Sequence, residues 1–331
     1  MSVRIGLIGA GGISTAHVKA IEAIDDAAIV AVSDLESDRA NTRAAEAKAG
    51  AVYTDFRKML DEQKLDAVWV CTPPSVRAEP IEACIERKLP VFTEKPVGVS
   101  AAAAAELAAR IERAGLPVMV GYVLRFMKVT DWLREHLAQD RVSLVCSTYC
   151  SPMTLNYAAK TPAPLWFYRK EISGGAIADQ ATHLFDLMRY LVGEVDTIYS
   201  LGSNCFQPKS AEYTVEDAYS VSFRFANGVL GVHGHTWCHA SWRSGLTLYG
   251  AKGMYALNCM RGRAEVETPD GKTMSYQPDD AMFVNEDRFF IDMVRRGDFS
   301  KLHCSFADGA RTLALTQKIL DVLDSPTSAT A

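Results

Sequence analysis

The chain of 331 residues has little of several features, and each scarcity excludes a class of protein. No apolar run approaches the roughly 18 residues that a membrane-spanning helix needs. Lys and Arg number 35 against 40 Asp and Glu, and the net charge of −5 argues against a nucleic-acid partner, since such proteins usually carry a basic face. The N-terminus has neither the separate charged region nor the small-residue cleavage site of a signal peptide. We therefore predict a cytoplasmic protein that binds neither nucleic acid nor membrane.

The cysteines also lack the pattern of a redox or metal-binding protein. No two of the eight form a CxxC pair. The nearest two, Cys146 and Cys150, lie four residues apart in a strand-like stretch, where a disulfide would strain the strand. We therefore expect reduced thiols, most of them buried as small hydrophobic side chains.

The first 120 residues alternate short apolar strands with helical segments. Strands are expected at 4–9, 27–34, 51–53, 66–72, 90–96 and 116–122. The segment 66–72 is nearly all apolar, as a parallel strand buried on both faces should be. Ser100, a preferred capping residue, and Gly115, which favours helix ends, bracket an alanine-rich helix. The alternation predicts an α/β fold with a doubly wound parallel sheet and right-handed crossovers.

A glycine-rich turn follows the first of these strands and opens a helix. Gly9 permits the tight turn, and Gly11 lets the backbone approach a pyrophosphate, which then rests on the N–H groups and positive dipole of the helix terminus. The third position of the glycine pattern holds Ser14, which is still small enough for close packing of helix and strand. Asp34 closes the second strand, at about the 20-residue distance expected of a carboxylate that binds ribose hydroxyls. This arrangement predicts a Rossmann dinucleotide site.

The charges around Asp34 bear on which dinucleotide binds. The carboxylate of Asp34 repels a 2′-phosphate and Glu36 adds to the repulsion, while Ser37 and Arg39 offset it in part. We therefore predict NAD as the cofactor, with NADP as the alternative. The predicted cofactor-binding residues are Gly9, Gly11, Gly12, Ile13, Asp34, Thr72, Pro73, Glu94 and Lys95.

After about residue 122 the pattern changes to hairpins and longer helices. Helices are expected at 131–139 and 175–192, with a proline-bearing loop between them. Asn227-Gly228 and Lys252-Gly253 mark hairpin turns between stretches of alternating polarity. This half of the chain therefore predicts an α+β domain with a large antiparallel sheet.

The sequence thus divides into two predicted domains. Residues 1–121 form the Rossmann domain, and residues 122–324 form the α+β domain for substrate binding and oligomerisation. The last helix, 306–323, is a candidate to pack back on the first domain, and a flexible tail is expected at 325–331.

Two segments carry polar groups suited to the oxidation of an alcohol. Lys95, in Glu94-Lys95-Pro96, closes the fifth strand of the Rossmann half, and ligands bind at the carboxyl ends of such strands. Its ammonium group can stabilise the alkoxide that develops as hydride leaves. Asp179 and His183 lie four residues apart on one predicted helix, away from its apolar stripe, so both are expected to line a cleft.

These motifs resemble those of the Gfo/Idh/MocA oxidoreductases, the family of glucose–fructose oxidoreductase and inositol dehydrogenase. The likeness covers nearly the whole chain and rests on GAGGIS, on EKP at 94–96 and on SGG…DxxxH at 173–183. It implies Lys95, Asp179 and His183 as active-site residues and a cis Lys–Pro peptide. It also implies an open-faced antiparallel sheet that packs in homodimers or homotetramers.

The resemblance implies a hydride transfer between nicotinamide and a secondary alcohol of a sugar, polyol or inositol. His183 would take the proton and Lys95 would steady the oxygen, and an imidazole pKa of about 6.5 suits such a base near neutral pH. Arg125 and Trp166 are predicted substrate contacts, like Asp179 and His183. The chain departs from the family at Arg77, near the position of a common histidine, and in the segment after Gly121, so the identity of the substrate stays open.

Two other functions stay open. One is a glycoside hydrolase that uses NAD for a transient oxidation, and the other is a non-catalytic NAD-sensing regulator. A metal site is the alternative interpretation of His233, His235 and His239, but a third ligand in fixed geometry is not visible, so strand or edge histidines are expected and no metal.

Overall fold

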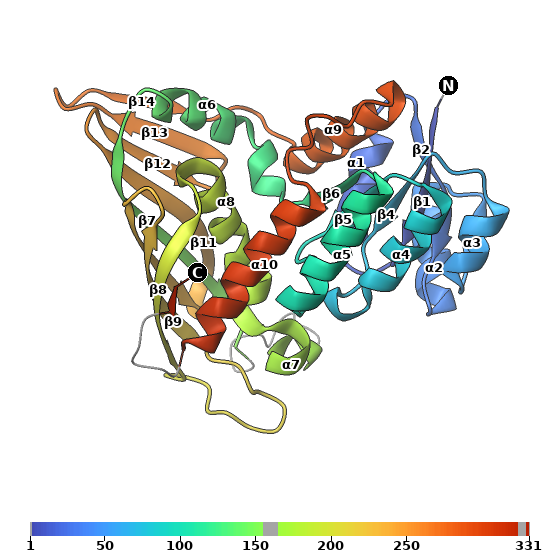
Figure 1. Cartoon of the computed structure of the whole chain (residues 1–331), viewed down its shortest axis with the longest axis horizontal. Coiled ribbons are helices and arrows are strands. Elements are labelled where there is room, and N and C mark those ends of the chain that lie inside the picture. The colour runs from blue at the N-terminus through green and yellow to red at the C-terminus, as the bar shows by residue number, and fades with distance from the viewer. Residues whose placement is uncertain (1, 155–164, 324–328, 331) are drawn as a thin grey trace. The chain divides into compact units, whose positions relative to one another are not determined.

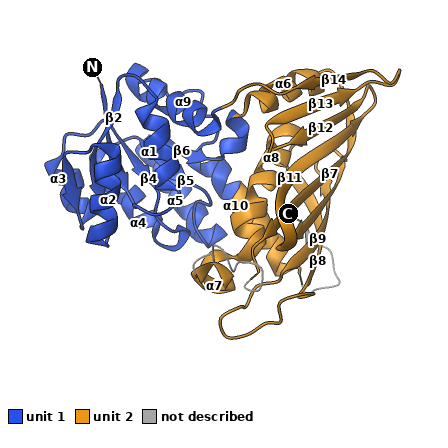
Figure 2. Ribbon diagram, turned by 180° about the vertical axis from the view of Figure 1, so that it is seen from behind, with its two compact units in different colours: residues 1–126, 281–311 blue, residues 127–280, 312–331 orange. Residues whose placement is uncertain are grey.

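The computed structural model describes residues 2–154, 165–323 and 329–330, and the chain divides into two compact units (Figure 2). Unit 1 comprises residues 1–126 and 281–311, and unit 2 comprises residues 127–280 and 312–331. The second predicted domain, 122–324, therefore differs from unit 2, since residues 281–311 belong to unit 1. The physical reason is that a helix near the end of the chain buries Phe290 and Ile291 in the apolar core of the first unit.

Unit 1 contains a six-stranded sheet in which every pair of neighbours is parallel, in the order β3-β2-β1-β4-β5-β6 (Figure 1). Its strands are β1 (Val3–Ile8), β2 (Ala27–Ser33), β3 (Ala51–Tyr53), β4 (Ala67–Val70), β5 (Val91–Glu94) and β6 (Val118–Gly121). Every residue of β4 is buried, as its apolar sequence predicts. The predicted doubly wound parallel sheet is confirmed.

Helices cover both faces of this sheet. One face carries α1 (Ser14–Glu22), α2 (Ser37–Ala47) and α9 (Met282–Arg296), and the other carries α3 (Phe56–Glu62), α4 (Ala78–Arg87) and α5 (Ala101–Ala114). Short 3₁₀ turns η1 (Pro74–Val76) and η2 (Val123–Phe126) follow β4 and β6. As predicted, the hydroxyl of Ser100 accepts a hydrogen bond from the N–H of Ala103, and Gly115 ends α5 in the left-handed conformation.

Aromatic rings join α9 to the sheet. The indole of Trp69 on β4 stacks on Phe92 of β5, with ring centroids 5.4 Å apart. Phe290 of α9 meets the same indole edge-on at 5.5 Å. Because all three side chains are fully buried, this contact contributes strongly to the core of unit 1.

Unit 2 contains a nine-stranded sheet in the order β14-β13-β12-β11-β7-β10-β9-β8-β15. Its strands are β7 (Val142–Pro152), β8 (Val195–Ser203), β9 (Ala218–Phe225), β10 (Leu230–Thr236), β11 (Cys238–Gly250), β12 (Met254–Asn258), β13 (Arg263–Glu267), β14 (Thr273–Tyr276) and β15 (Ala329–Thr330). Neighbours are antiparallel except for the parallel pair β7 and β10. The two predicted hairpins join β9 to β10 and β11 to β12.

The helical segments of unit 2 pack on one face of this sheet. They are α6 (Lys128–Leu137), η4 (Leu165–Tyr168), α7 (Lys170–Ser173), the π-helical turn η5 (Ile177–Ala181) and α8 (Thr182–Val192). The opposite face, here called the open face, presents exposed apolar side chains at Tyr199, Leu201, Leu230, Val232 and Tyr249. Strand alternation produces this result, since Ser200, between Tyr199 and Leu201, and Gly231, between Leu230 and Val232, are buried.

The last helix, α10 (Phe306–Asp321), spans the division between the units, with residues 306–311 in unit 1. Within unit 2, the Thr312 hydroxyl accepts a hydrogen bond from Arg189 and donates one to Asp186. The predicted flexible tail lies outside the described residues except at Ala329–Thr330. Those two residues form β15, because the edge strand β8 offers unpaired backbone groups, so the tail prediction is wrong there.

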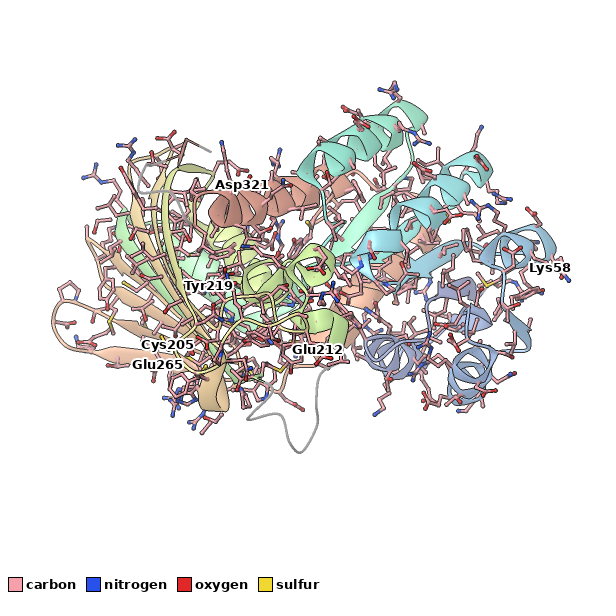
Figure 3. All side chains as sticks on the ribbon, turned by 90° about the horizontal axis from the view of Figure 1, so that it is seen from below. Lys58, Cys205, Glu212, Tyr219, Glu265 and Asp321 are labelled. Carbon is pink, nitrogen blue, oxygen red and sulfur yellow. The ribbon has the colours of Figure 1, made fainter. Side chains whose placement is uncertain are left out.

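Two further observations concern the surface and the thiols. Among the described residues, no helix has both the length and the apolar character needed to cross a membrane. All eight cysteines are free, and among them Cys205 is exposed (labelled in Figure 3).

The glycine turn generates a prediction for stability. Gly9 has a φ of +97°, and a Cβ there would lie 2.7–2.8 Å from backbone atoms of Cys71 and Thr72. A left-handed residue costs about 1–2 kcal/mol and overpacking about 1–3 kcal/mol, so Gly9→Ala should destabilise unit 1 by about 3 kcal/mol. Thermal and urea denaturation measure this. In the control Gly11→Ala the new Cβ meets nothing within 4 Å, so equal stability of both variants would contradict the close approach.

Candidate active site

The glycine turn and Asp34 meet at the carboxyl edge of the parallel sheet. The N–H of Ala10, within the turn, donates to Oδ2 of Asp34 at 2.8 Å. Oδ1 of Asp34 accepts from the N–H of Glu36 at 2.9 Å and from the Arg39 guanidinium at 3.1 Å. Partial burial opposes ionisation, but the N–H groups of Glu36 and Ala10 and the charge of Arg39 hold the pKa of Asp34 below its usual value. The carboxylate is therefore ionised and fixed beside the turn.

The residues present fit a dinucleotide. A Cβ at Gly11 or Gly12 would meet nothing within 4 Å, so the backbone there borders open space at the N-terminus of α1. Ser14 is fully buried and its hydroxyl donates to the carbonyl of Gly11 at 2.6 Å, which explains why this position tolerates serine. Ile13 beside it is partly exposed. Gly11, Gly12, Ile13 and Asp34 would hold the pyrophosphate and ribose.

The Glu94–Lys95–Pro96 turn ends β5, and its Lys95–Pro96 peptide is cis, as the family resemblance implied. The carboxylate of Glu94 is buried, and its Oε2 accepts the N–H of Lys95 at 2.9 Å. Its Oε1 lies 3.0 Å from Nε2 of His17. The Glu94 side chain, predicted to bind the cofactor, therefore faces the interior, where it fixes the turn that carries Lys95.

Arg77 holds the same turn from the other side. Its guanidinium donates to the carbonyl of Glu94 at 2.6 Å and also to the carbonyls of Pro96 and Thr72. The side chain is 2% exposed. As a departure from the family that bears on the substrate, Arg77 was expected at the rim of the cleft. The structure corrects this, because three converging carbonyls draw the guanidinium beneath the ends of β4 and β5.

Two glycines precede the second polar segment in unit 2. Gly174 and Gly175 have φ values of +69° and +68°, and a Cβ at Gly174 would lie 2.5 Å from that of Ala178. The Ser173 hydroxyl accepts the N–H of Gly175 at 2.9 Å and donates to the carbonyl of Phe167 at 2.7 Å. The SGG sequence is thus needed for the backbone to enter the following turn.

The helix expected over 175–192 is confirmed, and it contains the π-helical turn η5, which holds Asp179 and runs directly into α8, whose first turn holds His183. The turn is held by Gln180, whose Oε1 accepts the indole N–H of Trp237 at 2.8 Å and the Ser151 hydroxyl at 3.1 Å. π-helical turns of this kind are frequent at functional sites. Asp179 and His183 are both half-buried.

Tyr149 on β7 neighbours Asp179. Burial, with a smaller contribution from the charge of Asp179, raises the pKa of the Tyr149 hydroxyl above its usual value. The sequence gives no signal for Tyr149, since an isolated tyrosine on a strand is usually a packing residue.

The two predicted substrate contacts have defined surroundings. Arg125 is 3% exposed, forms an ion pair with Asp308 at 2.8 Å and donates to the carbonyl of His303 at 2.6 Å, all within unit 1. Trp166 in unit 2 is half-buried and meets Phe167 edge-on, with centroids 5.6 Å apart. A substrate role for either stays a prediction.

A buried polar group in unit 1 escaped the sequence analysis. Nδ1 of His17 on α1 lies 2.9 Å from Oδ1 of Asp287 on α9, and the indole N–H of Trp69 donates to the same oxygen at 2.9 Å. His17 comes five residues after Gly12, but a lone histidine on a helix gives no specific signal. Asp287 lies 270 residues away in sequence from His17, so only folding reveals the pair.

The histidines considered for a metal lie apart from this group. His233 and His235 are buried on β10, and burial lowers the pKa of His233 to about 3. Nδ1 of His233 lies 2.8 Å from the Ser147 hydroxyl, whereas His239 bonds to the carbonyl of Ser241. Among the described residues, one group of three side chains has metal-binding atoms close enough together to hold an ion, and it consists of His17, Glu286 and Asp287.

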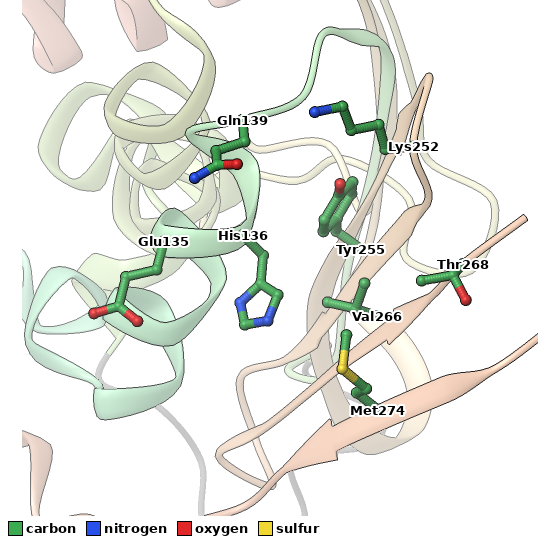
Figure 4. Close-up of a pocket in the computed structure, with 8 residues that line it drawn as sticks. All are labelled: Glu135, His136, Gln139, Lys252, Tyr255, Val266, Thr268 and Met274. Carbon is green, nitrogen blue, oxygen red and sulfur yellow. The ribbon is translucent and has the colours of Figure 1, made fainter.

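A cavity of about 440 Å³ lies within unit 2 between α6 and the strands β12 to β14 (Figure 4). Its lining residues are Glu135, His136, Gln139, Lys252, Tyr255, Val266, Thr268 and Met274. None of the predicted site residues is among them, so this cavity is separate from the predicted active-site residues.

Comparison with known proteins bears on these residues. The N-terminal model of the Gfo/Idh/MocA family, an oxidoreductase family with an NAD-binding Rossmann fold, matches residues 3–122. The model of the family's C-terminal domain matches residues 141–256. The uncharacterized oxidoreductase YrbE of Bacillus subtilis is 30% identical over 228 residues, which are 69% of this chain and 65% of that protein.

Two further proteins are similar over nearly their whole length. Inositol 2-dehydrogenase of Rhizobium meliloti is 28% identical over 327 residues, 95% of each chain. A solved structure of levoglucosan dehydrogenase with NADH and levoglucosan has the same fold, with a TM-score of 0.89 at 20% identity, covering 100% of this chain and 99% of that one. With both domains matched in order, the chain belongs to the Gfo/Idh/MocA family of NAD-binding oxidoreductases.

Proposed function

We propose that this protein is an NAD-dependent dehydrogenase that oxidises a secondary alcohol of a sugar, polyol or inositol. The observation that carries the proposal is the turn at 94–96. It holds Lys95 at the carboxyl end of β5, on the same sheet edge as the glycine turn after β1 and Asp34 after β2. The relatives named as dehydrogenases of inositol and of levoglucosan support a polyhydroxylated ring as the substrate.

The residues would divide the chemistry as follows. His183 takes the hydroxyl proton of the substrate as general base, and the Lys95 ammonium donates a hydrogen bond to the oxygen as its negative charge grows. Asp179 orients the substrate or the imidazole of His183. NAD, when bound, supplies the acceptor for the hydride that leaves the carbon as the C=O bond forms. The proton and the hydride together balance the oxidation.

A homo-oligomer formed through the open face is part of this proposal. Exposed apolar patches of monomeric proteins are usually small, and such a sheet face needs a cover. Register places Val232 and Leu230 of β10 beside Cys146 and Leu144 of β7, so apolar groups continue onto that strand, whereas on the side of β9 they meet Ser222 and Arg224. Free cysteines at all eight positions fit the proposed cytoplasmic location, where thiols stay reduced.

The catalytic assignment predicts separate effects on rate and binding. Lys95→Ala and His183→Ala should each lower kcat by about 10²–10⁴-fold, the usual contribution of general acid–base groups. The NAD dissociation constant should change far less, because the predicted pyrophosphate and ribose contacts lie at Gly11, Gly12 and Asp34. Steady-state NADH formation with monosaccharides, polyols and inositols measures kcat, and fluorescence titration measures binding.

Two exposed residues outside the site, Lys58→Ala (Figure 3) and Lys64→Ala, serve as controls and should keep wild-type rates. Sustained NADH formation also separates a dehydrogenase from an NAD-dependent glycoside hydrolase and from a non-catalytic regulator. Wild-type turnover in both Lys95→Ala and His183→Ala would refute the assignment.

The position of Asp34 predicts a preference for NAD over NADP. Asp34→Ser removes a charged acceptor for the ribose hydroxyls and a repulsion toward a 2′-phosphate, while Arg39 beside it remains. Hydrogen bonds to charged groups contribute about 1.5–3 kcal/mol, so the ratio of the two dissociation constants should shift toward NADP by about tenfold or more. Titration of both cofactors measures the ratio, with Asp61→Ser on α3 as the control. Tighter NADP binding by the wild type would overturn the prediction.

The proposed oligomer predicts that a charge on the open face dissociates it. Val232 is 42% exposed at the middle of that face, and Val232→Glu would bury a carboxylate in the interface. Light scattering after gel filtration should show the wild type as a multiple of the chain mass and Val232→Glu as a single chain. Val52→Glu, a 39% exposed valine on β3, should keep the wild-type mass. A single-chain mass for the wild type would rule the oligomer out.

A further inference from the structure

The imidazole of His17 lies in the interior of unit 1 between two carboxylates. Its Nε2 is 3.0 Å from Oε1 of Glu94, and its Nδ1 is 2.9 Å and 3.0 Å from the two oxygens of Asp287. His17 and Asp287 are fully buried and Glu94 is 3% exposed. The rings of Phe92 and Phe283 meet the imidazole edge-on at 5.0 Å and 5.7 Å, which excludes water from two sides.

Both ring nitrogens of His17 must donate. Oδ1 of Asp287 already accepts from the Trp69 indole, and Oε2 of Glu94 accepts the N–H of Lys95, so both carboxylates act as acceptors. A neutral imidazole has one N–H and would turn a lone pair toward one of the two carboxylates. An imidazolium has two N–H groups and satisfies both.

The titratable groups around His17 favour the same state. They come from β5 (Glu94), from α9 (Glu286 and Asp287) and from the end of β4 (Cys71). Burial alone would lower the pKa of His17, but the charge of Asp287 and the hydrogen bonds to Asp287 and Glu94 raise it well above its usual value. Burial raises the pKa of Cys71 to about 12, so that thiol is neutral near pH 7.

We propose that His17, as an imidazolium, is the positioning residue that fixes Glu94 and thereby the backbone of the Lys95 turn. The connection runs from Asp287 through His17 to Glu94, and from the Glu94 carboxylate to the N–H of Lys95. The guanidinium of Arg77 binds the carbonyls of Glu94 and Pro96 in the same turn. Two cations therefore hold the turn: the imidazolium of His17 through the Glu94 carboxylate, and Arg77 through the backbone. The effect on catalysis rests on the function proposed above, whereas the protonation state does not.

The first test needs no substrate and is measured on the wild-type protein, with one substitution used only to assign the signals. In wild-type protein labelled with ¹⁵N-histidine, both ring nitrogens of His17 should carry slowly exchanging protons at pH 7.5, assigned by their loss in His17→Gly. The charge persists above the ordinary histidine pKa of about 6.5 because the folded-state pKa is raised. A single protonated ring nitrogen at this pH would overturn the proposal.

The second test reads the turn itself. Asp287→Asn keeps the shape of the side chain and removes the charge that keeps His17 protonated. Amide exchange at Lys95 should accelerate about tenfold or more in this variant. His136→Asn, on α6 of unit 2, is the matched control and should leave exchange at Lys95 unchanged. Unchanged exchange in Asp287→Asn would also overturn the proposal.

The third test separates charge from packing. His17→Gly should lower kcat about 10–100-fold, as expected of a misplaced catalytic group, while the NAD dissociation constant stays within about twofold. Added imidazole should restore most of kcat below pH 7, where it is cationic, and pyrazole, which has the same shape but stays neutral, should not. Equal rescue by both would mean that His17 only fills space. An inactive wild type would instead refute the proposed function and leave the first two tests decisive.

Discussion

The pairing of buried charges between α1, β5 and α9 is the constraint on which unit 1 depends. Asp287 enters the core on α9, a helix that follows β14 of unit 2 in the chain. A buried carboxylate left without its partner costs about 3–5 kcal/mol, so His17 and Asp287 are each tolerated because the other is present. The same helix brings Phe290 onto Trp69, so apolar packing and charge pairing place α9 together.

The polar groups beneath the carboxyl edge of the sheet fix the position of the Lys95 turn more than they stabilise the fold. An apolar core of equal volume would often be as stable as a buried ion pair. Hydrogen bonds, however, have direction, and Glu94 and Arg77 fix the N–H and the carbonyl of the peptide group that precedes Lys95, while Arg77 also binds the carbonyl of Pro96. A lysine side chain is flexible, so the position of its amine depends on how firmly its backbone is held. Burying these charged groups costs desolvation free energy, and in return the backbone of the Lys95 turn is held in one position.

In unit 2 the segment that carries Asp179 is also held in place, and there the geometry of the backbone contributes. The left-handed glycines 174 and 175 admit a π-helical turn, and Gln180 bonds that turn to the sheet through Trp237 and Ser151. One side chain thus holds the segment that carries Asp179. The open face of the sheet carries the exposed apolar side chains named above together with polar ones such as Arg224, which bonds to Asp196.

Much of this protein follows from its sequence because the signals are local. The strand and helix alternation, the glycine turn with Asp34 and the left-handed end of α5 at Gly115 depend on neighbours within a few tens of residues. The interior placement of Arg77 and Glu94, the π-helical turn before His183 and the pairing of His17 with Asp287 were decided only by tertiary structure. A side chain buries its charge only where distant segments supply acceptors, and sequence alone does not place those segments together.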